Sequence, residues 1–253
     1  MLAQAIVVDQ VYISGYFNDS WPIELAIQTE GNHIAAGQVY YTESDSHPIL
    51  LVGWWEDYPS DDEFTYHNIR LFELQESGII SGSYIIHLKK QKNGHFQFSD
   101  GQRTYLSMEE GDEESPIINA TCSNKMPEWF QPTLVPAAPH EIGESYEYRV
   151  HGTNSGFLDI GFNDDGSFSF NVGDNPVGES FFEAANDVDR PATLVGNVME
   201  YLNSNYCNDT LRASFYRDFV VIETLQVPGA DHDCYSINAV MLKKSHDEDE
   251  EGY

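Results

Sequence analysis

The chain has 253 residues, of which 42 are acidic and 12 basic, giving a formal net charge of −30. Its 14 Phe, 15 Tyr and 4 Trp within a 41% hydrophobic content supply enough apolar surface for folded cores, which excludes a wholly disordered chain. The negative charge disfavours nucleic acids and anionic membrane surfaces as partners. It is explained either by solubility or a saline habitat, or by attraction of a basic partner.

The N-terminal residues resemble the end of a secretory signal peptide. Leu2-Ala3-Gln4-Ala5 follows the small-x-small pattern that precedes signal cleavage. We therefore expect a periplasmic or secreted protein, with an ordinary cytoplasmic N-terminus as the alternative. No apolar run approaches the roughly 18 residues that a membrane span needs.

The first half of the chain predicts a β-barrel. Segments rich in β-branched and aromatic residues alternate with turn-forming residues such as Lys92-Asn93-Gly94. The predicted strands cover residues 6–17, 23–29, 34–42, 49–56, 65–74, 80–89 and 95–99. Turns that recur about every 10 to 15 residues are typical of an antiparallel meander that closes on itself, so we expect one barrel over residues 6–115.

A proline-rich segment interrupts this pattern. Residues 126–140 read "MPEWFQPTLVPAAPH", and proline removes ladder donors and favours extended backbone. We interpret residues 116–141 as an interdomain linker and expect Trp129 and Phe130 to pack against one of the barrels.

Strand signals resume over residues 142–244. The predicted strands cover residues 146–150, 156–162, 167–172, 192–202, 210–216, 219–227 and 235–243. Asn163-Asp164-Asp165-Gly166 predicts a hairpin turn, because Asp-Gly adopts positive φ at low cost. The acidic tail, residues 245–253, lacks periodicity and is expected to be disordered. The fold class is therefore all-β, with two antiparallel β-barrel or β-sandwich domains joined by a Pro-rich linker.

The three cysteines give an odd count. Cys207 and Cys234 each lie on or beside a predicted strand of the second half, and we expect them to form a disulfide. Cys122 would then be a free, buried thiol. The alternative is three reduced cysteines in a cytosolic protein.

The first half resembles small secreted, lipocalin-like β-barrel domains of Gram-negative bacteria. The similarity covers roughly residues 7–108 and lies in the order of a Gly-x-Tyr strand, "PILLVGWWED", "NIRLFELQ" and "GIISGSY". This resemblance implies a fold and no particular function.

The second half, roughly residues 146–244, resembles the periplasmic lysozyme inhibitors. "YEYRVHGTNSGFLDI", "ATLVGNVMEY", "FVVIETL", the two cysteines and a final Lys-Lys strand follow the order of that family. In the family, a Ser-Gly-x-x-Tyr loop enters the lysozyme cleft. The resemblance implies a partner-binding site at Asn154, Ser155, Gly156 and Asp159. Asp159 occupies the family's Tyr position, and catalytic carboxylates would repel it. The alternative is that Ser155 and Gly156 are turn residues selected for backbone geometry.

No catalytic signature is present. The sequence lacks Gly-x-Ser-x-Gly, a phosphate-binding glycine loop, His-Glu-x-x-His and Cys-x-x-Cys, so we expect a non-enzymatic protein without metal or cofactor. Trp21, Trp54, Trp55 and Tyr58 are candidates for a ligand mouth in the first barrel. Adjacent residues of a strand point to opposite faces, so one of Trp54 and Trp55 is expected in the core and the other outside.

Three functions remain open. The first is an exported binding protein whose target is a basic protein such as lysozyme, with electrostatically steered association. The second is a lipocalin-like carrier that holds a small apolar ligand inside the first barrel. The third is an envelope-interaction module without a small ligand.

Overall fold

In a computed structural model, the chain forms two compact units, of which one spans Gln4–Val135 and the other is formed mainly by Pro136–Tyr253. The structure describes residues 7–18, 20–43, 47–59, 64–106, 113–150, 155–162, 168–175, 182–183, 192–203, 209–225 and 238–244. Within these residues, no helix is long and apolar enough to cross a membrane.

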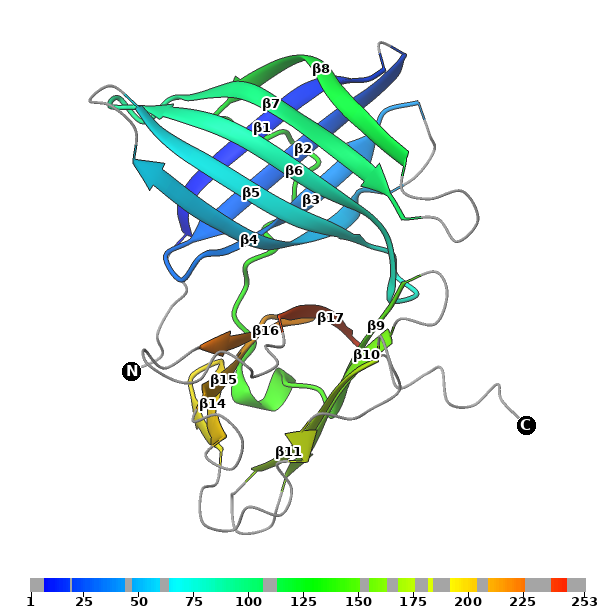
Figure 1. Ribbon diagram of the computed structural model, residues 1–253, viewed down its shortest axis with the longest axis vertical. Coiled ribbons are helices and arrows are strands. Elements are labelled where there is room, and N and C mark those ends of the chain that lie inside the picture. Colours follow the sequence, from blue (N-terminus) through cyan, green and yellow to red (C-terminus); the bar gives the residue numbers. More distant parts are fainter. Residues whose placement is uncertain are drawn as a thin grey trace. The chain divides into compact units, whose positions relative to one another are not determined.

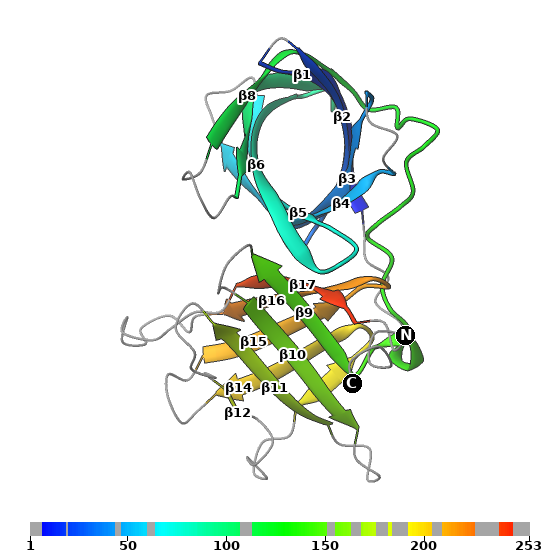
Figure 2. The ribbon, with the colours of Figure 1, turned by 90° about the vertical axis from the view of Figure 1, so that its right-hand side faces the viewer.

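The first unit is an eight-stranded antiparallel β-barrel (Figures 1 and 2). Each strand pairs with the next along the chain, and β8 pairs with β1 to close the ring. The strands are β1 (Val7–Phe17), β2 (Trp21–Glu30), β3 (Ile34–Tyr41), β4 (Ile49–Pro59), β5 (Phe64–Leu74), β6 (Ile79–Gln91), β7 (Phe96–Tyr105) and β8 (Glu113–Ser123). The predicted closed antiparallel meander is confirmed.

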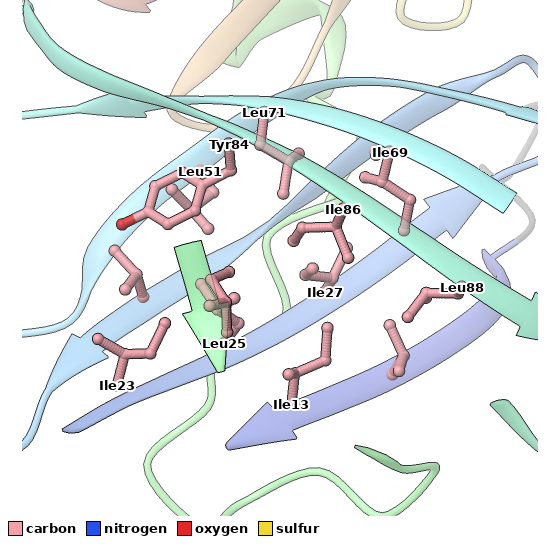
Figure 3. Close-up of a cluster of buried hydrophobic side chains, with 14 of the residues drawn as sticks. Ile13, Ile23, Leu25, Ile27, Leu51, Ile69, Leu71, Tyr84, Ile86 and Leu88 are labelled. Carbon is pink, nitrogen blue, oxygen red and sulfur yellow. The ribbon is translucent and has the colours of Figure 1, made fainter. Parts of the chain in front are cut away.

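Side chains fill the interior of the barrel. Alternate residues of every strand point inward, and an eight-stranded barrel is just wide enough for these side chains to meet. Figure 3 shows aliphatic side chains of β1, β2, β4, β5 and β6 packed together with Tyr84. The members drawn and labelled there are Ile13, Ile23, Leu25, Ile27, Leu51, Ile69, Leu71, Tyr84, Ile86 and Leu88. The hydrophobic core of this unit therefore lies inside the barrel.

Two inward glycines allow neighbouring strands to approach closely. A Cβ atom on Gly53 would lie 2.0 Å from the carbonyl oxygen of Arg70, and one on Gly37 would lie 2.1 Å from that of Ala26. Atoms cannot approach so closely, so any side chain at these positions would push the backbones apart. Gly37 and Gly53 therefore permit the tight curvature of the β2–β5 wall.

The barrel extends beyond the predicted boundary at residue 115. Residues 116–123, expected in the linker, belong to β8, which pairs with both β7 and β1. Pro116 obscured this strand in the sequence because proline cannot donate to a ladder, and it is accommodated near the strand's start. The linker expected over residues 116–141 thus begins with a barrel strand.

The segment after β8 lies against the outer face of β2 and β3, as predicted for Trp129. The Trp129 indole Nε1 donates to Glu24 Oε2 at 2.6 Å, and the ring lies 5.7 Å from that of Tyr40. The segment also donates two backbone N–H groups: that of Gln131 to the Gln38 side chain, and that of Thr133 to the Gln28 side chain. These contacts explain why the outward-facing Gln28 of β2 is buried.

The second unit contains a curved antiparallel sheet around its own core. Its strands pair in the order β13-β14-β15-β16-β17-β9-β10-β11-β12. They are β9 (Ser145–Val150), β10 (Ser155–Phe162), β11 (Phe168–Asn175), β12 (Phe182–Glu183), β13 (Thr193–Val195), β14 (Val198–Asn203), β15 (Asp209–Phe215), β16 (Phe219–Leu225) and β17 (Ala239–Lys243), and a 3₁₀ turn, η1 (Pro139–Glu141), precedes them. Tyr146 and Phe215 are fully buried in its core, with ring centroids 5.6 Å apart.

The all-β class is confirmed, and so is the predicted hairpin, formed by β10 and β11. Residue-by-residue pairings run from β13 through β17 and β9 to β12, and a second closed barrel or sandwich stays a prediction. Cys122 is a free, half-buried thiol, and burial raises its pKa to about 11. The expected Cys207–Cys234 disulfide and the acidic tail lie outside the described residues.

Candidate binding pocket at the barrel mouth

One end of the barrel carries an open pocket of about 470 Å³. Its walls come from the ends of β1, β2, β3, β7 and β8. The described residues that line it are Phe17, Asn18, Trp21, Tyr41, Arg103, Tyr105 and Ser115. The pocket therefore combines four aromatic rings with three polar side chains, of which one is a guanidinium.

Strand β5 places a carboxylate beneath this pocket. Residues 67, 69, 71 and 73 share the inward face, so the alternation that buries Ile69 and Leu71 also directs Glu73 into the barrel. Glu73 is 2% exposed. A carboxylate this deeply buried needs compensating partners.

Five side chains supply those partners, of which Gln75 is the most distant, with its Nε2 3.5 Å from Glu73 Oε1. The hydroxyl groups of Tyr41, Tyr84 and Ser81 donate to the Glu73 carboxylate at 2.6, 2.9 and 2.7 Å. Arg103 donates through Nε and Nη2 to both carboxylate oxygens, at 3.2 and 3.3 Å. The two tyrosine hydroxyls are also 2.7 Å apart. We call Glu73 and its four nearer partners, Tyr41, Ser81, Tyr84 and Arg103, the mouth cluster.

Both charges of the cluster are retained. Burial alone would raise the pKa of Glu73, but Arg103 and the hydrogen bonds from Tyr41 and Ser81 outweigh it and hold this pKa below its ordinary value. Burial would lower the pKa of Arg103, whereas the neighbouring Tyr84, Tyr41 and Glu73 raise it. Burial and the Glu73 charge raise the pKa of Tyr41, which therefore stays protonated and donates.

The position of the Arg103 side chain is fixed from several sides. Its guanidinium carbon lies 5.2 Å from the ring centre of Tyr105 and 5.9 Å from that of Tyr41. Gly82 on β6 leaves the space for it, because a Cβ there would lie 3.2 Å from both Nε and Nη2. Arg103 is thus a preorganised donor at the pocket wall.

The outer rim of the pocket is aromatic and accessible. Trp21 is 63% exposed and Tyr105 is 42% exposed, whereas Phe17 is buried in the barrel core. Large exposed aromatic side chains beside a concave polar surface are typical of binding sites. This arrangement can hold a flat ligand against Trp21 and Tyr105 while Arg103 and its neighbours form hydrogen bonds.

The structure separates the four residues predicted as a ligand mouth. Trp21 lines the pocket, but β4 runs from the pocket end at Ile49 to the opposite end of the barrel, so it carries Trp54, Trp55 and Tyr58 away. Of the four residues predicted to line a ligand mouth, Trp21 alone therefore lies at the pocket.

Those three residues have other surroundings. Trp55 is in the core, where its Nε1 donates to the carbonyl oxygen of Glu30 at 2.8 Å. Trp54 packs edge-on against Phe72 outside the barrel, which confirms the expected opposite orientation of the two tryptophans. Tyr58 is exposed and donates to Glu56.

The mouth cluster was missed from sequence, although one signal was available. Glu73 continues the inward face of Ile69 and Leu71, and a charged residue on the apolar face of a strand needs an explanation. Arg103 lay beyond the strand predicted for residues 95–99, because β7 continues to Tyr105. Its partnership with Glu73 spans 30 residues and has no local signature.

In the second unit, Ser155 and Gly156 belong to a strand. Both lie in β10, where they pair with Arg149 and Tyr148 of β9 as well as with β11. A Cβ on Gly156 would lie 2.2 Å from the Tyr148 ring, so glycine is needed here for packing. These pairings differ from the loop that the resemblance implies.

The two other residues predicted to bind a partner are Asp159 and Asn154. Asp159 is exposed on the outer face of β10 and accepts a hydrogen bond from Ser145 Oγ at 2.7 Å. Asn154 lies outside the described residues. Elsewhere in the described ranges, no three His, Cys, Asp or Glu side chains are grouped as metal ligands would be.

Comparisons with known proteins find similarity among solved structures. No family model matches the sequence, and no curated protein matches it. Among solved structures, the chain is similar to a protein of unknown function from the DUF3598 family of Nostoc punctiforme PCC 73102. The identity is 8% over 86% of this chain and 78% of the other, with a TM-score of 0.27.

Proposed function

We propose that the barrel unit is a non-enzymatic binding module for a small molecule and that the pocket at its mouth is the binding site. The observation that carries this proposal is an open pocket of about 470 Å³ in which exposed aromatic rings surround a guanidinium held in place by a buried carboxylate. Ligand sites in proteins have this volume and combine apolar walls with a few fixed polar groups.

The packed interior favours binding at the mouth over binding inside the barrel. Inward side chains of all eight strands meet in one hydrophobic cluster, as Figure 3 shows for its central part. A lipocalin-like carrier would have to displace this core, which costs cavity and transfer free energy. The proposal therefore retains the small ligand of the carrier hypothesis and moves its site to the rim.

The test uses Nile red, an uncharged aromatic dye whose emission rises in apolar surroundings. We expect saturable enhancement with the natural protein and a loss of at least fivefold in affinity for Trp21→Ala. Trp54→Ala is the matched control, because Trp54 packs against Phe72 on the outer wall. Equal affinities in the natural protein and both variants would refute the mouth as the site.

A second candidate is binding of a basic protein, favoured by the net charge of −30. Such a complex should form quickly at low ionic strength and more slowly at 0.5 M salt, because screening removes the attraction. Inhibition of c-type, g-type and i-type lysozymes at the two salt concentrations tests it, with Ser155→Arg alongside. No inhibition of any class at low salt would discard lysozyme as the target.

A further inference from the structure

We propose that the mouth pocket selects an uncharged ring that carries a hydrogen-bond acceptor, in preference to an organic anion or cation of the same shape. This inference rests on the proposed function and names the ligand class of the same site. It follows from three properties of the pocket: its charge, its donors and its walls.

Among the described residues that line the pocket, charge is balanced. Arg103 is the one charged side chain in this described lining, and its guanidinium forms a bidentate pair with Glu73. A second carboxylate on the same guanidinium would leave one net negative charge in a partly buried site, in a protein of net charge −30. An organic cation would meet the like charge of Arg103, and the described part of the lining offers it no acidic side chain. Both kinds of ion are therefore disfavoured.

The polar part of the lining is rich in donors. A guanidinium has five N–H groups, and the Nε and Nη2 edge of Arg103 is directed at Glu73, which leaves the Nη1 and Nη2 edge. Glu73 is buried and does not line the pocket, whereas Arg103 does, so the free edge is the part available to a ligand. The amide of Asn18, which donates to Ser115 Oγ at 3.3 Å, adds a second polar group. Such a wall fits a carbonyl or ether oxygen.

The aromatic walls define the rest of the ligand. Trp21 and Tyr105 present exposed ring surface, and Phe17 and Tyr41 complete the lining. Flat rings stack on such surfaces and gain from burial of apolar area. The ligand class is thus a flat ring with an acceptor on its edge.

The test compares four soluble probes that share a phenyl ring: acetophenone, benzoate, benzyltrimethylammonium and ethylbenzene. Binding is followed at pH 7 through the indole N–H resonance of Trp21, assigned by its absence in Trp21→Phe. We expect acetophenone to bind at least fivefold more tightly than each of the other three, because it alone is uncharged and accepts from Arg103. In Arg103→Lys, which keeps the charge but loses the planar donor edge, acetophenone should bind no better than ethylbenzene.

The outcomes separate this inference from the proposed function. Tighter binding of benzoate or benzyltrimethylammonium would overturn the ligand class and leave the pocket as a binding site. Failure of all four probes to shift the Trp21 resonance would overturn both. The probe comparison on the natural protein decides the question even where Arg103→Lys does not fold.

Discussion

Replacement of Arg103 by methionine tests whether the mouth cluster is a buried ion pair that the barrel depends on. The substitution removes the guanidinium but keeps a flexible apolar chain of similar length. Glu73, which is 2% exposed in the natural protein, would keep its hydrogen bonds from Tyr41, Tyr84, Ser81 and Gln75 but would lose its positively charged partner.

The expected cost in the free energy of unfolding follows from that uncompensated charge. Removal of one partner of a buried pair costs about 3–5 kcal/mol, and we expect the lower half of this range because Arg103 itself is partly accessible. Replacement of both partners, in the double variant Glu73→Gln with Arg103→Met, should cost less than the single change. The double variant is thus the matched control, since it removes the pair without leaving a charge.

The pH dependence of the free energy of unfolding provides a second, independent test of the ion pair. In the natural protein the pKa of Glu73 is lowered, so its contribution to stability is present above the unfolded pKa of about 4.3 and is lost as pH falls through the folded value. Without Arg103, burial raises the pKa of Glu73, and protonation relieves the buried charge. The free energy of unfolding of Arg103→Met should therefore rise as the pH falls from 7 to 5. In the natural protein, Glu73 adds no stability over this fall in pH.

Urea unfolding followed by tryptophan fluorescence measures these changes in the barrel, because all four tryptophans, at positions 21, 54, 55 and 129, lie in the Gln4–Val135 unit. A loss below about 1 kcal/mol for Arg103→Met, with an unchanged pH profile, would refute the role of the pair.

Three further predictions use the same assay. His67 is 3% exposed, its Nδ1 lies 2.7 Å from Asp57, and its Nε2 has no hydrogen-bond partner among the described residues. Burial lowers the pKa of His67 against the opposing effect of Asp57, so barrel stability should fall as pH drops below the unfolded value of about 6.5, and His67→Phe should flatten that slope. If stability depends on pH equally steeply in His67→Phe, groups other than His67 cause the loss of stability at low pH. Gly53→Ala should cost about 1–3 kcal/mol, because the new Cβ would overlap the Arg70 carbonyl; a neutral result would show that the β4–β5 wall can expand. Trp129→Ala should cost about 1–2 kcal/mol through the lost hydrogen bond to Glu24 and ring packing, and an unchanged urea midpoint would contradict the described contact.

The architecture of the barrel was predictable because strand alternation and turn residues are local signals. The first seven strands are visible in this way, and so is the β10–β11 hairpin. The last strand was not, because Pro116 and its acidic neighbours resemble a linker until β7 offers them a pairing edge. A closed ring is a non-local property that no window of sequence contains.

The candidate site was predictable only in part. An exposed aromatic residue next to Pro22 pointed to Trp21, whereas Trp54 and Trp55 were grouped with it by residue type although β4 carries them to the other end. The Glu73–Arg103 pair joins strands β5 and β7 across β6, so it depends on the register of three strands. An ion pair of this kind can be identified once the pairing and register of the strands are known.

One measurement tests the central claim that the ligand binds at the barrel mouth. The four indole N–H resonances, assigned by single Trp→Phe variants, are followed in a titration with acetophenone. The account predicts a saturable shift of the Trp21 resonance, with that of Trp55 unchanged because its indole lies in the packed interior and donates to Glu30. A saturable shift of Trp55 without one of Trp21 would place the ligand inside the barrel and contradict the account.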